Sequence, residues 1–500
     1  MPTTTDSEVV QPPGRSLRQR ALSGVLWAAL EKWMVRGSTL IGFIVLGNLL
    51  SPEQFGVVAL AMTFITILTI VADAGFSTYL VQVQRLTAVT TSTAFYISVL
   101  LGAVLAGALW LAAAPLAAVL DAPPLEQVLP ALAVSVLLAG LSSVPAALLQ
   151  KELRFRELAK RQVLATALSV VAAIALAVGG AGVWALVGQT LVRSVISCAA
   201  LWLSTDFRPR WAFSLGQARE MTSFGVQSML VKLGTQARDQ GEVFFIGVLA
   251  GTTALGFWTV ATRIAGVVAS LSITAVTMVS QPVFARLQGD RARLARALGT
   301  STAMGALVLV PVLVALSLTS GFVVPGVFGD QWAASAGIAA VLALRTLLSS
   351  LSDLTRSALL ATGHPGAELA LTGVLLVVQI ALVLVLADGD LVLLAAALTG
   401  WMVVGWPLRA LVLRRLLDVP LSTFSATLAV VLAGGVAAGA VLAAQEWLQL
   451  EGLAYVGLVV ALGAVVYLGA ALLMARSLVG DLLGTLTSTL GRGRRSRHRA

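Results

Sequence analysis

The segment LGNLLSPEQFGVVALA, residues Leu46–Ala61, decides the fold, because it can be laid without a gap over IGVLAGTTALGFWTVA, residues Ile246–Ala261. The positions that coincide are Gly47 with Gly247, Leu49 with Leu249, Gly56 with Gly256 and Ala61 with Ala261. Slightly upstream, Lys32 falls on Lys232 at the same spacing. The chain therefore contains an internal repeat in which two similar halves follow one another.

The composition around this repeat requires a lipid environment. Of the 500 residues, 58% are hydrophobic and only 11% are charged, with a mean hydropathy of +0.94. A water-soluble core cannot hold so much apolar surface. Because a membrane helix needs roughly 20 apolar residues, we predict about fourteen spans between Leu22 and Ala475. The second of them is predicted as one helix over Gly56–Leu80.

The polar segments between the apolar stretches alternate in charge sign, and this alternation predicts the orientation of the chain in the membrane. Most of the 33 basic residues lie in the two tails and in every second polar segment, whereas the intervening loops hold acids such as Glu53, Asp121, Asp330 and Asp388. Basic loops stay in the cytoplasm. Both termini are therefore expected to be cytoplasmic, with an even number of spans.

The repeat and the orientation together predict an all-α polytopic membrane protein with two lobes of about six helices each. Halves of equal orientation are related by a pseudo-two-fold axis along the membrane normal, a plan known in transporters. The expected ranges are a disordered cytosolic tail at 1–20, an N-lobe at 21–210, a C-lobe at 211–417, two further helices at 418–476 and a basic cytosolic tail at 477–500.

Several classes of function are disfavoured by what the chain lacks. The tail GRGRRSRHR, Gly491–Arg499, suits anionic lipid headgroups rather than nucleic acid when it lies beside a bilayer. The sequence has no GxxxxGK[ST], HExxH or CxxC motif, and its two histidines are His364 and His498. We therefore expect neither an enzyme nor a bound metal or cofactor, and interpret the single cysteine, Cys198, as a packing residue.

Charged residues inside the predicted spans are the candidate site. Six cations near the middle of their spans would cost about 15 to 20 kcal/mol if they faced lipid, so they must face water or partners. They are Lys32, Arg36, Lys232, Arg238, Arg263 and Arg345. Five acids are candidates for coupling or gating: Glu31, Asp73, Asp239, Glu242 and Asp353.

Some of these charges can pair within one helix. Arg238 and Glu242 lie four positions apart, and Asp353 and Arg356 three, so ion pairs with a purely structural role are an alternative there. Lys32, Arg36, Arg263 and Arg345 have no acid three or four positions away. An excess of cations suits a substrate with concentrated negative charge, such as phosphate or pyrophosphate, which arginine can bind bidentately.

Three regions of the chain resemble a known family. They are LLSPEQFGVVALAMTFITILTIVADAGFSTYLVQ (Leu49–Gln82), PAALLQKELRFRELAKRQ (Pro145–Gln162), and DQGEVFFIGVLAGTTALGFWTVATRI with QPVFARLQGDRARLARAL (Asp239–Ile264 and Gln281–Leu298). They resemble polysaccharide repeat-unit flippases, the Wzx-type branch of the multidrug/oligosaccharidyl-lipid/polysaccharide (MOP) exporter superfamily.

The resemblance implies two lobes around a central cavity in the bacterial cytoplasmic membrane. The implied cargo is an undecaprenyl-pyrophosphate-linked oligosaccharide, moved from the inner to the outer leaflet for cell-surface polysaccharide such as lipopolysaccharide. Membrane lipids, a polysaccharide polymerase and glycosyltransferases are the implied partners. The similarity also extends to lipid II flippases, whose last two helices form a lipid-side groove.

Two other functions remain open from the sequence. An ion-coupled multidrug extruder of the same superfamily would want excess carboxylates, whereas here the cations inside the spans outnumber the acids. A membrane scaffold could recruit polysaccharide enzymes through the basic segment Lys151–Arg161, but this would leave the charges inside the spans without a purpose.

Overall fold

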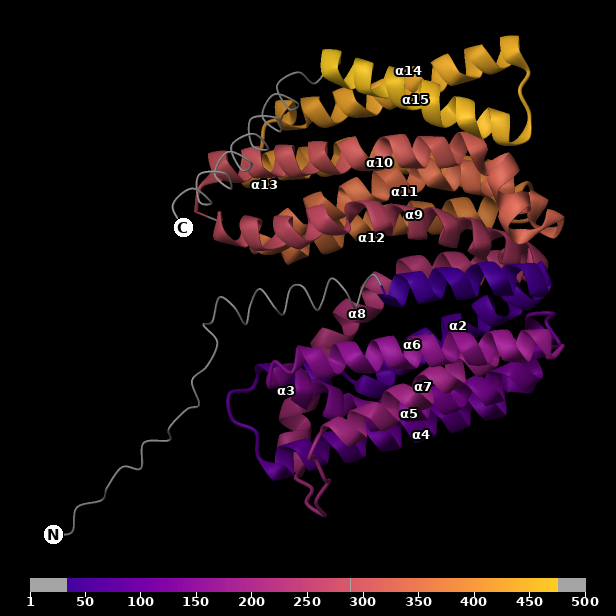
Figure 1. Ribbon diagram of the computed structural model, residues 1–500. Coiled ribbons are helices and arrows are strands. Elements are labelled where there is room, and N and C mark those ends of the chain that lie inside the picture. The colour runs from indigo at the N-terminus through magenta and orange to yellow at the C-terminus, as the bar shows by residue number, and fades with distance from the viewer. Residues whose placement is uncertain (1–33, 288, 475–500) are drawn as a thin grey trace, which may run out of the picture. The chain divides into compact units, whose positions relative to one another are not determined.

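The computed structural model describes residues 34–287 and 289–474, apart from the side chains of 235, 274–282 and 285, and all regular structure in these ranges is helical (Figure 1). The predicted tails at 1–20 and 477–500, together with Glu31 and Lys32, lie outside the described residues.

The helices follow one another with short connections. The helical segment Met34–Leu49 comes first. After it come α2 (Pro52–Asp73), α3 (Phe76–Gln82), α4 (Ala88–Val119), α5 (Leu125–Lys151), α6 (Phe155–Val178), α7 (Trp184–Ser204) and α8 (Leu215–Leu249). The second half contains α9 (Gly251–Arg286), α10 (Arg291–Phe328), α11 (Ala333–Ala361), α12 (Pro365–Leu386), α13 (Leu391–Leu417), α14 (Ser425–Leu448) and α15 (Gly452–Met474).

Most of these helices are long and apolar enough to cross a membrane. Twelve qualify among the described residues, which confirms the prediction of an all-α polytopic membrane protein. The helix α8 has 35 residues but carries several charges, and Met34–Leu49 is shorter. The predicted number of fourteen spans and the predicted residue ranges of the lobes stay predictions.

Turn residues end the helices where the sequence has them. The connections DAPP and GGAG separate α4 from α5 and α6 from α7. At the start of α2, the Ser51 backbone N–H donates to the Gln54 side chain (3.1 Å) and the Gln54 backbone N–H donates to the Ser51 hydroxyl (3.4 Å). This reciprocal cap satisfies two N–H groups that have no partner within the helix.

The prediction of one uninterrupted helix over Gly56–Leu80 is wrong. The chain breaks between α2 and α3, where Ala74 and Gly75 have φ of 47° and 73°. Gly75 lies so close to Gly225 that a Cβ on Gly75 would overlap the Gly225 carbonyl. The apolar pattern continues through the break, so it gave no sign of this backbone change.

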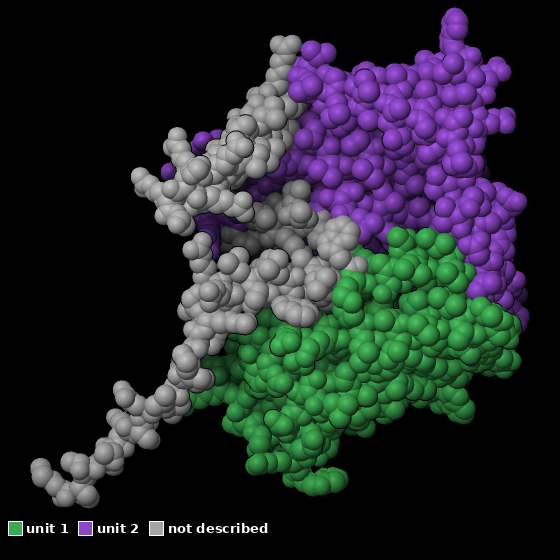
Figure 2. Space-filling view, viewed as in Figure 1, with its two compact units in different colours: residues 1–46, 64–116, 125–235 green, residues 47–63, 117–124, 236–500 purple. Residues whose placement is uncertain are grey.

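The described chain forms two compact units (Figure 2). Of the described residues, unit 1 comprises 34–46, 64–116 and 125–235, and unit 2 comprises 47–63, 117–124, 236–287 and 289–474. In unit 1, the core around α3 and α5 contains Phe76, Leu80, Val144 and Met221, all buried. Gly140 of α5 packs on the backbone of α4, since a Cβ there would lie 2.5 Å from the Ser98 oxygen.

Unit 2 contains the contact between the two copies of the repeat. A Cβ on Gly56 would overlap the carbonyl oxygen of Thr252, and a Cβ on Gly256 would overlap that of Pro52. The contact is reciprocal at a spacing of 200 positions, so the repeat detected in the sequence is also a repeat in space. In membranes, glycines at such crossings allow two helix backbones to approach closely.

The helices α9, α11, α14 and α15 of unit 2 pack against α10. Trp332, fully buried, donates its Nε1–H to the carbonyl of Gly47 at 2.7 Å. The last two helices, α14 and α15, lie side by side against α10 (Figure 1). Gly434 permits the approach of α14, because a Cβ there would overlap Val310 of α10.

We predict that Gly56→Ala and Gly256→Ala each destabilise the protein by about 1 to 3 kcal/mol, because the added methyl must push two backbones apart. The measurement is the free energy of unfolding in detergent. Gly107→Ala is the control, since nothing lies within 4 Å of its added Cβ on α4. Its effect should stay within about 0.5 kcal/mol. Equal effects of all three changes would contradict the assigned crossing.

Candidate functional site

The charges predicted to form the site fall into two groups, one in each unit. In unit 1, Arg36 lies in the helical segment Met34–Leu49, Asp73 is the last residue of α2, and Lys232 lies on α8. Unit 2 holds the others, which are Arg238, Asp239 and Glu242 of α8, Arg263 of α9, and Arg345 and Asp353 of α11.

Asp73 is the centre of the polar cluster in unit 1. Its carboxylate accepts hydrogen bonds from the Ser77 hydroxyl (2.7 Å) and the Ser143 hydroxyl (2.6 Å). Lys232 Nζ lies 3.2 Å from Asp73 Oδ2. These contacts join α2, α3, α5 and α8 at the break after α2. Since 42% of the Lys232 side chain is exposed, its ammonium group can also reach a molecule outside the cluster.

Glu242 is the centre of a larger network in unit 2. Both of its oxygens accept from the Arg345 guanidinium, at 2.9 and 2.6 Å. Trp258 Nε1 donates to it at 3.0 Å and Gln379 Nε2 at 2.7 Å. One buried carboxylate thus connects α8, α9, α11 and α12. A buried charge with several good hydrogen bonds is tolerated where an unpaired one is not.

A second buried ion pair, which the sequence analysis did not single out, lies nearby. Arg409 of α13 forms two hydrogen bonds to the carboxylate of Glu368 of α12, at 2.6 and 3.1 Å, and each side chain is only 7% exposed. In the sequence, both residues lie at the polar ends of apolar stretches. Extending the predicted helices beyond the apolar stretches could have found both residues, because α12 starts at Pro365 and α13 ends at Leu417.

Two of the pairing expectations can be compared with the geometry. Asp353 and Arg356 do pair, at 3.8 Å. The expected pair of Arg238 with Glu242 is wrong: Arg238 lies 2.9 Å from Asp239, while Glu242 binds Arg345. Arg345, which has no acid within reach on its own helix, finds one on another helix, and helix spacing alone cannot reveal such a partner.

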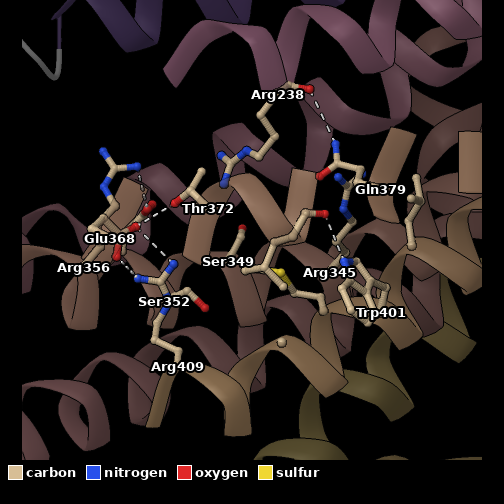
Figure 3. A pocket seen from close by; sticks show the side chains of 15 residues that line it. Arg238, Arg345, Ser349, Ser352, Arg356, Glu368, Thr372, Gln379, Trp401 and Arg409 are labelled. Carbon is tan, nitrogen blue, oxygen red and sulfur yellow. Dashed lines mark hydrogen bonds and ion pairs between the residues drawn. The ribbon is translucent and has the colours of Figure 1, made fainter. Parts of the chain in front are cut away.

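A pocket lies beside these pairs, between α8, α11, α12 and α13 of unit 2 (Figure 3). Its empty volume is about 650 Å³ including the mouth. Its polar lining consists of the four arginines Arg238, Arg345, Arg356 and Arg409, the acids Asp353 and Glu368, and Ser349, Ser352, Thr372, Gln379 and Trp401. In the part of the chain that the structure describes, no group of His, Cys, Asp and Glu could hold a metal ion.

The arginines of this pocket divide into two kinds. Arg345 and Arg409 are held in bidentate pairs and are 19% and 7% exposed. Arg238 and Arg356 are 35% and 39% exposed, and their acid neighbours Asp239 and Asp353 are more exposed still. The first two stabilise the helix packing, whereas the second two can interact with water or a ligand.

Solved structures identify the fold of this chain. A lipid II flippase, MurJ, in an inward closed conformation superposes with a TM-score of 0.74, covering 91% of this chain and 100% of the other at 12% identity. An inward-facing multidrug resistance transporter of the MATE family, itself in the MOP superfamily, gives a TM-score of 0.59, with 79% and 99% covered at 16% identity. The chain has the fold of MOP superfamily transporters.

Sequence comparison gives the family. Residues 45–337 match the model of a family described as polysaccharide biosynthesis protein, and the chain belongs to that family. The resemblance to a family of polysaccharide biosynthesis proteins is thereby confirmed.

Three curated relatives agree with this assignment. The succinoglycan biosynthesis transport protein ExoT of Rhizobium meliloti is 28% identical over 64% of this chain, and the match spans 64% of that relative's length. The teichuronic acid biosynthesis protein TuaB of Bacillus subtilis is 26% identical, with 76% and 79% covered. The lipopolysaccharide biosynthesis protein WzxC of Escherichia coli is 24% identical, with 69% and 71% covered.

We predict that Glu368→Gln lowers the free energy of unfolding in detergent by about 3 to 5 kcal/mol, because it leaves the Arg409 charge buried without its partner. The double variant Glu368→Leu with Arg409→Met should recover most of this loss, since it removes both charges.

Asp353→Asn is the matched control from the same pocket. Its pair with Arg356 is long and exposed, so the effect should be below about 1 kcal/mol. If the double variant were as unstable as Glu368→Gln alone, the loss would not come from an unpaired Arg409.

Proposed function

We propose that this chain is a flippase that moves an undecaprenyl-pyrophosphate-linked oligosaccharide from the inner to the outer leaflet of the bacterial cytoplasmic membrane by alternating access. Membership of a family of polysaccharide biosynthesis proteins, together with the MOP transporter fold, supports this function. The relatives are named for transport or biosynthesis of three different polysaccharides, so the class of cargo is better supported than its sugar.

The observation that carries the proposal is the presence of exposed cations in long helices, one of which, α9, is a candidate membrane span. Arg263 is exposed in α9, between Gly251 and Arg286, and Lys232 and Arg238 are partly exposed in α8. A cation facing lipid at this depth costs roughly 2.5 to 3.5 kcal/mol, and more by some estimates. Facing a water-filled pathway, the same cation costs little and attracts an anionic group.

In this mechanism the cations of each unit replace water around the pyrophosphate while the prenyl chain stays in lipid. We assign this role to Arg36 and Lys232 in unit 1 and to Arg238 and Arg263 in unit 2. Lys32 belongs to the same proposed set by its position in the sequence. Arg345 has a different role, because its pair with Glu242 makes it a structural residue that positions α8 against α11.

The acids Asp73, Asp239 and Asp353 complete the proposal. Each lies beside a cation that is at least one-third exposed, namely Lys232, Arg238 and Arg356. An arriving pyrophosphate competes with these carboxylates for the cations, so we assign the acids to release of the cargo. The positive-inside rule places both termini in the cytoplasm, where a polymerase and glycosyltransferases of the same pathway are the proposed partners.

We predict that Arg263→Gln lowers export of the lipid-linked oligosaccharide at least about tenfold, since it removes one charge-assisted contact with the headgroup. Each variant is expressed in a strain without the chromosomal gene. The measurement is the leaflet in which the oligosaccharide accumulates, detected with a label that does not cross the membrane. Surface polysaccharide is measured in parallel.

Arg296→Gln, an exposed arginine in the first turns of α10, is the control and should export normally. Protein abundance must be equal in all strains. Normal export by Arg263→Gln would remove that residue from the pathway. An unchanged leaflet distribution in the deletion strain, together with lost drug resistance, would favour the multidrug extruder instead.

A further inference from the structure

The segment TDFRPRWAFS, residues 205–214, connects α7 to α8 in unit 1 and contains no helix. It protrudes beside the start of α4 (Figure 1). We call it the α7–α8 segment. Its Trp211 is 99% exposed, and Phe213 and the following Leu215 are exposed as well. Arg208 and Arg210 of the same segment are also exposed. Aromatic, apolar and basic side chains are thus presented together at one end of the helices.

Contacts with α4 hold this segment in place. The Arg210 backbone N–H donates to the Ser92 hydroxyl at 2.9 Å, and the Ser214 backbone N–H donates to the Thr93 hydroxyl at 3.1 Å. The ring of Phe207 packs against an aromatic ring of the same helix, with the centroids 5.8 Å apart. The two hydrogen bonds lie on either side of the exposed aromatic residues, so these side chains project from a backbone that is fixed on α4.

The contacts with α4 also give the depth of the segment in the membrane. The 32 residues of α4 span about 48 Å, whereas the hydrocarbon layer is about 30 Å thick. About 9 Å of the helix therefore extends beyond the hydrocarbon at each end. Ser92 and Thr93, which hold the segment, lie about 6 to 8 Å from the start of α4. The segment is thus at the depth of the lipid headgroups.

Trp211 lies slightly deeper than the backbone contacts. Its ring stacks on that of Tyr96, one helical turn further along α4, with the centroids 6.1 Å apart. Tryptophan and tyrosine favour the boundary between headgroups and hydrocarbon, because each side chain has an apolar body and a polar tip. The exposed Trp211 is therefore placed to contact lipid.

The two arginines determine which lipid fits the segment. One nitrogen of Arg208 donates to the carbonyl oxygens of Thr205 (3.3 Å) and Phe207 (2.8 Å). A guanidinium has five N–H donors, so others remain for the oxygens of a phosphate. Asp206 is the one acid of the segment, which therefore carries a net positive charge. A phospholipid with a net negative charge is attracted to it, whereas in a zwitterionic lipid the ammonium group offsets the phosphate.

We propose that the α7–α8 segment binds an anionic phospholipid, with Arg208 and Arg210 at the headgroup phosphate and Trp211 at the top of the acyl chains. The inference goes beyond the proposed function, because the bound lipid is not the cargo and none of these residues was among the predicted site residues. Since the segment joins the first half of the chain to the second, the bound lipid holds this connection at the membrane surface.

The test places a fluorescent label beside the segment in the full chain. Gly216→Cys provides the attachment point, because the atom nearest to its added Cβ is the Ser214 hydroxyl oxygen at 3.8 Å, and Cys198→Ala removes the single cysteine of the chain. The labelled protein is placed in nanodiscs of phosphatidylcholine and phosphatidylglycerol, in which one lipid or the other carries bromine, a quencher of fluorescence. Per molecule, brominated phosphatidylglycerol should quench about fivefold more strongly, the factor expected for one net positive charge near the surface.

Variants of the arginines test the role of their charge. Arg208→Gln with Arg210→Gln should lower the preference to about onefold or below, while quenching by brominated phosphatidylcholine persists. Arg208→Lys with Arg210→Lys keeps both charges and should keep the preference, which guards against an effect of misfolding. Arg414→Gln with Arg415→Gln is the matched control, since it removes two charges from the exposed end of α13 and should leave the preference unchanged. Equal losses in the two glutamine pairs would overturn the proposal, because the lipid would then follow only the overall charge.

Trp211→Ala tests the depth of the segment. Quenching by both lipids should fall at least about twofold, since the label loses the ring that keeps it near the acyl chains. Unchanged quenching would overturn the placement of Trp211 at this boundary.

Two results with the wild-type segment would also overturn the proposal. Equal quenching by both lipids would show contact without a preference for negative charge, and no quenching by either would place the segment in water, where a partner protein could dock. Thermal unfolding in the same nanodiscs checks that every variant is folded. The experiment contains no oligosaccharide, so its failure and a failure of the export assay are distinguishable.

Discussion

The bidentate pair of Glu242 with Arg345 is the interaction on which the C-terminal part of the molecule depends. The Glu242 carboxylate, buried among apolar helices, is held by Arg345, Trp258 and Gln379, so four helices meet at one negative charge. Because an unpaired charge in this environment is so costly, these helices cannot separate without breaking the pair. The network therefore holds α8, α9, α11 and α12 together.

The same constraint divides the arginines into buried, paired residues and more exposed ones. Arg345 and Arg409 are neutralised by buried carboxylates, and their removal affects folding first. Arg238, Arg263 and Arg356 are more exposed. Within a membrane span, an exposed cation is tolerated only beside water. This distinction follows from burial and pairing, and residue type alone does not provide it.

Close backbone contacts complement these ion pairs. Gly56 packs on Thr252 and Gly256 packs on Pro52, so the two copies of the repeat contact each other through equivalent positions. In unit 1, Gly75 and Gly225 make a similar approach beside the Asp73 cluster. Close backbone contacts and paired charges together hold the helices of each unit in place.

The helical membrane class, the repeat and the family could be predicted without a structure, because apolar length and aligned motifs are properties of a linear string. The sequence also picked out the charges that needed an explanation. Three features became clear only from the three-dimensional structure. They are the acid that each arginine pairs with, the break at Ala74 and Gly75, and the buried pair of Arg409 with Glu368. The ion pairs join residues that lie on different helices. Glu242 and Arg345 are more than a hundred positions apart, and Glu368 and Arg409 lie on neighbouring helices. The sequence pattern of one helix cannot reveal such a partner, because the partner lies on another helix and comes close only when the helices pack.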